Sequence, residues 1–154
     1  MEIIITRYHR TSKAIEGRLT IDNSYICDTE EWPENRLRPG TYPLGLLKCK
    51  QYDRQMPMIM PNVRKFKVCM KCGTCAAAES CKQIRLVYNN TLLHNVCPML
   101  KPGNGVYGRK DGSIIVGQMV CPGCLAHPVE AFDRLMNLIR KTPDDEEITL
   151  QIVE

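Results

Sequence analysis

Short segments with strand character, separated by turn signals, fill most of this 154-residue chain. The clearest pair is Gly17–Ile21 and Ser24–Thr29, because Asp22 and Asn23 between them tolerate the left-handed conformation that a two-residue hairpin requires. Only one helix is predicted, from Pro128 onward, where apolar residues recur at helical spacing. We therefore expect an α+β fold, a mainly antiparallel sheet or barrel-like sheet with one helix of the C-terminal half packed on it.

Other elements are predicted less directly from alternation and from turn residues. Further strands are expected around Ile3–Ile5 and at Thr41–Cys49, Ile84–Tyr88, Thr91–Val96, Ser113–Gly117 and Ile148–Ile152. The helix is expected to bury Val129, Phe132, Met136 and Ile139. Proline-bracketed Met56–Pro61 is interpreted as an apolar loop that plugs the core. Glu30, Glu31 and Glu34 are assigned to a solvated acidic loop.

Composition limits the class of protein. The chain is 44% hydrophobic and 25% charged, which excludes a disordered or fibrous chain. Its length fits one domain spanning residues 1–154. No apolar run approaches a bilayer span, and the N-terminal residues lack the basic-then-apolar order of a secretory signal. We expect a cytoplasmic protein with no membrane partner.

Nine cysteines are the unusual feature of the composition. An odd number cannot all pair within one chain, and a disulfide scaffold is disfavoured without a secretory signal. Cys27 and Cys49 lie alone in apolar-alternating segments and are assigned to the core. Most of the others fall in a segment at about 67–83, which we interpret as a cysteine-rich insertion.

Two kinds of metal centre fit these cysteines. The candidate ligands are Cys69, Cys72, Cys75, Cys81, Cys121 and Cys124, with His127 and Cys97 as weaker candidates. Two Cys-x-x-Cys pairs could form a tetrahedral zinc site, although the gap between them is long. Three cysteines at steps of three resemble bacterial ferredoxin ligation and would suit an iron–sulfur cluster. A reduced, metal-free loop is the third interpretation.

Basic residues crowd the middle of the chain. Residues 48–85 hold nine Lys and Arg against Asp53 and Glu79, a surplus that could meet the phosphate backbone of a nucleic acid. Few aromatic residues accompany them, so a solvated basic face is the competing interpretation. Of the three histidines, His9 is predicted to be an exposed turn residue, His127 to begin the helix, and His94 to lie in a strand.

An ordered set of short motifs supplies a resemblance. The set is Gly17-Arg18-Leu19-Thr20-Ile21, Cys27-Asp28-Thr29-Glu30, Pro39-Gly40-Thr41-Tyr42-Pro43, Met56-Pro57 and Gly112-Ser113-Ile114-Ile115-Val116-Gly117. It resembles a family of uncharacterised bacterial and prophage proteins, known mainly as a domain of unknown function. The family's late "HxGN…GC-I-x-VG" pattern is similar to the active-site signature of L,D-transpeptidases, which act on peptidoglycan with a cysteine nucleophile.

This chain departs from that pattern at the reactive positions. Ser113 stands where the resemblance places the cysteine, and Lys101 stands where it places the histidine. Asn104 matches the family's "GN" element, and His94 is a weak substitute because it lies too far upstream. A serine without an adjacent base is barely nucleophilic. The resemblance therefore implies a compact β domain without transpeptidase activity.

Three hypotheses about function follow. The first is a non-catalytic, phage- or mobile-element-associated protein that serves as a binding module for peptidoglycan or for a phage structural protein. The second is a zinc or iron–sulfur protein that uses the Cys69–Cys81 segment. The third, less favoured, is a nucleic-acid-binding module.

Overall fold

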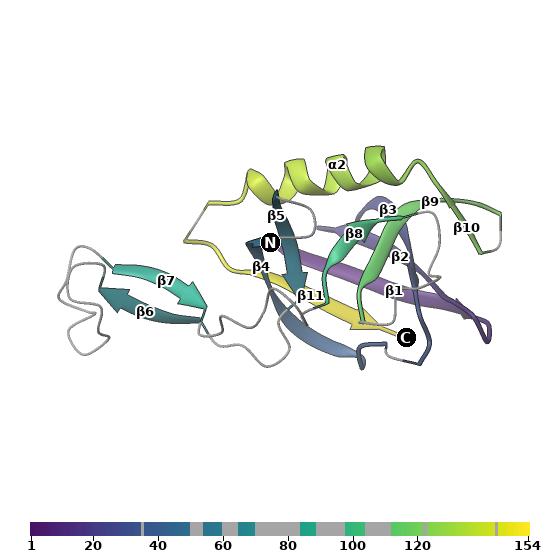
Figure 1. Ribbon diagram of the computed structural model, residues 1–154, viewed down its shortest axis with the longest axis horizontal. Coiled ribbons are helices and arrows are strands. Elements are labelled where there is room, and N and C mark those ends of the chain that lie inside the picture. The colour runs from purple at the N-terminus through teal and green to yellow at the C-terminus, as the bar shows by residue number, and fades with distance from the viewer. Residues whose placement is uncertain are drawn as a thin grey trace.

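The structure is a computed structural model that describes residues 1–34, 36–49, 54–59, 65–69, 84–88, 98–103, 112–121, 123–143 and 145–154. Nine strands form one mixed sheet, and one helix packs against it (Figure 1). The strands are β1 (Glu2–Arg10), β2 (Ile15–Ile21), β3 (Ser24–Glu31), β4 (Gly40–Cys49), β5 (Arg54–Ile59), β8 (Leu100–Pro102), β9 (Ile114–Cys121), β10 (Cys124–Ala126) and β11 (Ile148–Val153). The helix is α2 (Pro128–Arg140), and a separate two-stranded sheet pairs β6 (Lys65–Cys69) with β7 (Ile84–Tyr88).

The large sheet curls into a nearly closed barrel. Its strand order is β10-β9-β3-β2-β1-β11-β4-β5, and β8 pairs with β9. At the β5 end of this path, Met58 forms a bridge with Met99, the residue before β8, and Ile59 N–H donates to the Pro98 carbonyl at 2.8 Å. Most pairings are antiparallel, as predicted, but β1–β11 and β8–β9 are parallel. The expected α+β class with a mainly antiparallel, barrel-like sheet is therefore confirmed in outline.

The β2–β3 hairpin forms where the sequence predicts it. Asp22 and Asn23 have φ values of 50° and 66°, so both central residues of the turn are left-handed. This conformation matches the right-handed twist of the two flanking strands. The hairpin continues beyond the predicted segments, to Ile15 on one strand and Glu31 on the other.

The core lies between the inner face of the barrel and α2. Ile3 and Ile5, at alternate positions of β1, are fully buried, as the two-residue period of a strand requires, and Leu19 of β2 is buried with them. Cys27 is buried among them, as expected. From the helix, Phe132, Met136 and Ile139 join this core, but Val129 is 59% exposed. The prediction for Val129 is wrong because the first turn of α2 does not cover the sheet with that face.

One further interpretation needs correction. Met56–Pro61 does not form a loop within the part that is described, because residues up to Ile59 form β5, although Met56 and Met58 do fill the core. Ile84–Tyr88 is a strand, as predicted, and it pairs with β6. The strand predicted at Thr91–Val96 lies outside the described residues.

The acidic-loop interpretation is wrong for two of its three residues. Glu30 and Glu31 end strand β3 and are each 1% exposed, whereas Glu34 is exposed. Glu31 accepts two hydrogen bonds from the guanidinium of Arg7, at 2.9 and 2.6 Å. Arg7 also donates to the Leu37 carbonyl and to Glu154. This buried ion pair joins β1 to β3 and explains why a charged segment continues the strand.

In the described part of the chain, no helix is long and apolar enough to cross a membrane.

Candidate functional site

The positions that the resemblance assigns to catalysis are buried. Ser113 is 1% exposed, and its Oγ accepts a hydrogen bond from the backbone N–H of Met99 at 3.1 Å. Lys101 is 2% exposed and lies on β8 opposite Ile115 of β9. A serine hydroxyl that is buried and holds a backbone amide supports the sheet rather than facing a substrate. Asn104 and His94 lie outside the described residues.

Only part of the predicted metal site can be placed. Cys121 and Cys124 are exposed and unpaired. The predicted ligands Cys72, Cys75, Cys81 and Cys97, and the side chain of Cys69, lie outside what is described. His127 is exposed and caps α2 in a left-handed conformation with φ 50° and ψ 47°. In the described part of the chain, no group of three or more potential ligands could hold a metal ion. The zinc and iron–sulfur hypotheses stay predictions.

Most side chains of the basic segment, residues 48–85, lie outside what the structure describes. Of its nine basic residues, only Arg54 has a described side chain, and its guanidinium lies 5.3 Å from the centre of the Phe132 ring. A cation held against a core aromatic ring contributes to packing. The nucleic-acid hypothesis therefore stays untested.

A different set of side chains gathers on the outer face of β1, β2 and β3. The guanidinium of Arg18 lies 6.0 Å from the centre of the Tyr8 ring and 5.7 Å from that of Tyr25. The two tyrosines are 53% and 51% exposed. Tyrosine and arginine are enriched at protein interfaces, so two exposed tyrosines on either side of an arginine mark this surface as a candidate binding site. We call Tyr8, Arg18 and Tyr25 the tyrosine–arginine face.

Hydrogen bonds fix the position of Tyr25 in this face. The Tyr25 hydroxyl donates to Asp28 Oδ2 at 3.0 Å, and the same oxygen accepts the backbone N–H of Met119 at 2.7 Å. Burial of the hydroxyl and then its bond to Asp28 raise the pKa of Tyr25 to about 12. Because Asp28 is itself 7% exposed and bonded to β9, the Tyr25 ring is anchored from two strands. A pre-positioned ring loses less side-chain entropy on binding.

Two hollows adjoin the face, and Tyr8 borders both. The larger, of about 380 Å³, is lined by Thr6, Tyr8, Arg18 and Thr20. This volume is in the range of small-molecule pockets. Its lining combines the phenol ring of Tyr8, the guanidinium of Arg18 and the hydroxyls of two threonines.

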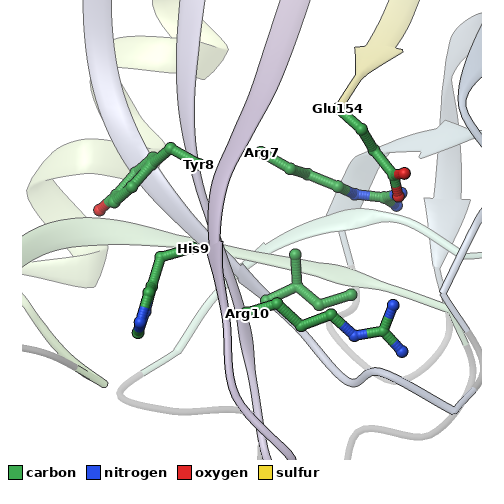
Figure 2. A pocket seen from close by; sticks show the side chains of 6 residues that line it. Arg7, Tyr8, His9, Arg10 and Glu154 are labelled. Carbon is green, nitrogen blue, oxygen red and sulfur yellow. The ribbon is translucent and has the colours of Figure 1, made fainter.

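The smaller hollow, of about 220 Å³, is shown in Figure 2. It is lined by Arg7, Tyr8, His9, Arg10, Ile15 and Glu154. Tyr8 and His9 project from one side of β1, whereas Arg7 and Arg10 project from the other (Figure 2). Arg7 is already paired with Glu154 in this hollow. The larger hollow, lined by Arg18, is therefore the one that favours an anionic ligand.

A row of buried carboxylates lies beside the face. His9 Nδ1 lies 3.2 Å from Glu16 Oε2, and Glu16 pairs across the β2–β3 ladder with Glu30. Glu16 Oε1 accepts the backbone N–H of Gly123 at 2.6 Å. Glu30 Oε1 has no hydrogen-bond partner among the described residues, and burial followed by the charge of Glu16 raises the pKa of Glu30 to about 7. His9, predicted as a turn residue, is instead a strand residue, exposed as expected.

Sequence reasoning missed the tyrosine–arginine face. Its members come from three strands, and two irregularities bring them together, one in β1 between Arg7 and His9 and one opposite β3 between Leu19 and Thr20. A bulge changes the direction of side chains without leaving a mark in the alternation pattern. The nearest signal in the sequence is Gly17-Arg18, which the resemblance includes without a role.

Comparisons of the sequence and the structure with family models, curated proteins and solved structures found no match.

Proposed function

We propose that this chain is a non-catalytic binding module, and that the tyrosine–arginine face takes an extended, carboxylate-bearing ligand of the peptidoglycan type. The observation that carries the proposal is the position of the Arg18 guanidinium between two exposed tyrosine rings, next to the 380 Å³ hollow. The cell-wall part of the proposal also relies on the resemblance of the chain's motifs to those of peptidoglycan-acting proteins. The association with phages or mobile elements depends on that resemblance alone.

The chemistry of the face fits such a ligand. A guanidinium can bind a carboxylate through two parallel hydrogen bonds, and peptidoglycan stem peptides carry free carboxylates. The rings of Tyr8 and Tyr25 offer flat apolar surfaces to sugar or alkyl groups, with hydroxyls at their edges. Thr6 and Thr20 add hydroxyl groups at the wall of the hollow. Tyrosine and arginine are also the residues that most often dominate binding free energy.

The buried positions of Ser113 and Lys101 support the non-catalytic part of the proposal. A nucleophile needs contact with the substrate. Ser113 has 1% of its surface exposed, and its hydroxyl holds a backbone amide.

Co-sedimentation with purified insoluble peptidoglycan tests the proposal. The wild-type chain should pellet with the sacculi, and Arg18→Gln and Tyr8→Ala should each weaken binding by about tenfold or more, the size expected for a central binding residue. Arg38→Gln is the matched control, because Arg38 is also exposed and its carbonyl accepts the Tyr42 hydroxyl of β4, a strand that β11 separates from β1. Wild-type protein that stays in the supernatant, or equal binding by Arg18→Gln and Arg38→Gln, would overturn the proposal.

Mass analysis of the same peptidoglycan fragments tests the non-catalytic part. No fragment should be cleaved or cross-linked after incubation with the chain. If products form and Ser113→Ala abolishes them, the chain is an enzyme and this part of the proposal is wrong.

A further inference from the structure

The β9–β10 turn brings two thiols together. Cys121 and Cys124 are register partners across the hairpin, with Pro122 and Gly123 between them in sequence. Gly123 has a φ of 79°, the value of the third residue in a type II turn, which commonly has proline before it. The first and fourth Cα atoms of such a turn are less than about 7 Å apart. A disulfide spans Cα atoms about 4.4–6.8 Å apart, so the backbone here is compatible with one.

The two thiols are accessible and close in the ladder. Both are exposed and free, and their residues are register partners across the hairpin. A contact with β2 also fixes the turn, because Gly123 N–H donates to the buried Glu16 carboxylate at 2.6 Å. The sulfur atoms therefore need little backbone movement to bond.

We propose that Cys121 and Cys124 form a redox-active dithiol, which is oxidised reversibly to a disulfide by low-molecular-weight or protein disulfides. This site is independent of the proposed binding function, because neither cysteine belongs to the tyrosine–arginine face. It differs from the metal hypothesis in its chemistry, since it needs only these two cysteines.

The exchange balances as two displacements. The thiolate of one cysteine attacks the disulfide RSSR, forms a mixed disulfide and releases one RS⁻. The thiolate of the other cysteine attacks the protein sulfur of that mixed disulfide and releases the second RS⁻. In sum, two thiols and RSSR give the protein disulfide and two RSH. The protein loses two electrons and two protons, and RSSR gains them.

Cys27 differs from this pair in exposure and in the pKa of its thiol. Cys27 is fully buried, and burial raises the pKa of its thiol to about 12, so it has neither access nor thiolate. The pKa of Cys121 is also raised, first by the hydrogen bond with Cys124 and then by burial and by the charges of Cys124, Glu16 and Glu30. Exchange at the pair should therefore be slow at neutral pH compared with a thioredoxin-type dithiol.

Mass spectrometry of the full chain tests this inference. The protein is stripped of metal with EDTA, equilibrated in buffers of reduced and oxidised glutathione, quenched in acid, alkylated and digested with trypsin. The sequence places Cys121 and Cys124 alone on the tryptic peptide 111–134, so other cysteines do not interfere. The expected result is a peptide that loses two hydrogens as the buffer becomes more oxidising and regains them with dithiothreitol.

Two serine variants complete the test. In Cys121→Ser and Cys124→Ser, the remaining cysteine should carry one glutathione instead of losing hydrogen, because the second displacement is blocked. Wild-type peptide 111–134 that stays fully alkylated across the whole redox range would overturn the inference. Peptide 111–134 found cross-linked to another cysteine peptide of the chain would overturn it as well.

Discussion

Glu16 and Glu30 lie directly opposite each other on β2 and β3, and only 4% and 1% of their surfaces are exposed. Like charges at directly opposed positions of a ladder repel, and burial strengthens the repulsion. The pair avoids this cost when one carboxyl is neutral. Burial and then the charge of Glu16 raise the pKa of Glu30 to about 7, which favours the neutral form of Glu30 below that pH.

This pair makes stability depend on pH. An unfolded glutamate titrates near pH 4.5, so between about pH 4.5 and 7 the folded chain holds a proton that the unfolded chain has lost. The free energy of unfolding should therefore fall as the pH rises through this range and then level off. Glu30→Gln should remove most of this fall and stabilise the fold at pH 8 by about 1–3 kcal/mol. Urea denaturation at pH 5, 6, 7 and 8 measures both effects.

Glu34→Gln is the control for this experiment, because Glu34 is exposed on the same acidic segment. It should change neither the stability nor its pH dependence. If Glu30→Gln and the wild type lose stability equally between pH 5 and 8, the assignment of the proton to Glu30 is wrong.

The Arg7–Glu31 pair predicts a large loss of stability. Burial alone would lower the pKa of Arg7, but hydrogen bonds and charge from Glu31 and Glu154 raise it overall, so the buried guanidinium stays ionised. Glu31→Gln leaves a buried guanidinium short of its main counter-charge and should cost about 3–5 kcal/mol of unfolding free energy. Glu154 contacts the same guanidinium at 3.0 Å but is 51% exposed, so Glu154→Gln should cost less than about 1 kcal/mol. Chemical denaturation that gives equal losses for the two variants would contradict this argument.

Replacing Thr29 is expected to increase the free energy of unfolding. It is fully buried on β3, and its Oγ1 has no hydrogen-bond partner in the part of the chain that is described. Thr29→Val keeps the shape and replaces an unsatisfied hydroxyl with a methyl group, so the fold should gain about 1 kcal/mol. Thr41→Val, at an exposed position of β4, is the matched control and should stay within about 0.5 kcal/mol of the wild type. A clear loss of stability in Thr29→Val would mean that the hydroxyl has a partner.

Gly17 packs closely against Thr29. A Cβ added to Gly17 would lie 2.6 Å from Thr29 Oγ1 and 3.2 Å from the Thr6 carbonyl oxygen. There is thus no room for a side chain at Gly17. This close approach gives a structural reason for the glycine in the Gly17-Arg18-Leu19 motif.

Ser113 provides a test that separates structure from catalysis. Ser113→Ala removes the acceptor for Met99 N–H and should cost about 1–2 kcal/mol of stability. It should leave the sedimentation with peptidoglycan unchanged, because Ser113 is buried away from the tyrosine–arginine face. Weaker binding by Ser113→Ala in protein that is shown to be folded would place Ser113 in the binding site.

Single strands, turns and the helix could be predicted from the sequence, but the pairing of distant strands could not. The Asp22-Asn23 turn and the helix from Pro128 are fixed by residues close in sequence, and both are confirmed. The parallel pairing of β1 with β11 joins the two ends of the sequence, and alternation in each strand says nothing of its partner. The burial of Glu31 depends likewise on Arg7, which is 24 residues away.

The candidate sites show the same division. Spacing alone identified Cys121 and Cys124, and the structure adds the register and the Glu16 contact that make the pair a redox candidate. The tyrosine–arginine face could not be predicted, because bulges in the ladders set the direction of its side chains.

The hydrogen bond from Ile59 to Pro98 has a consequence for the middle of the chain. It places the point where residues 60–97 leave the barrel next to the point where they return. A short glycine–serine linker could therefore bridge these two residues, and its closure would cost no more entropy than the longer segment does. A chain in which such a linker replaces residues 60–97 would therefore let the barrel be assayed alone for what it binds.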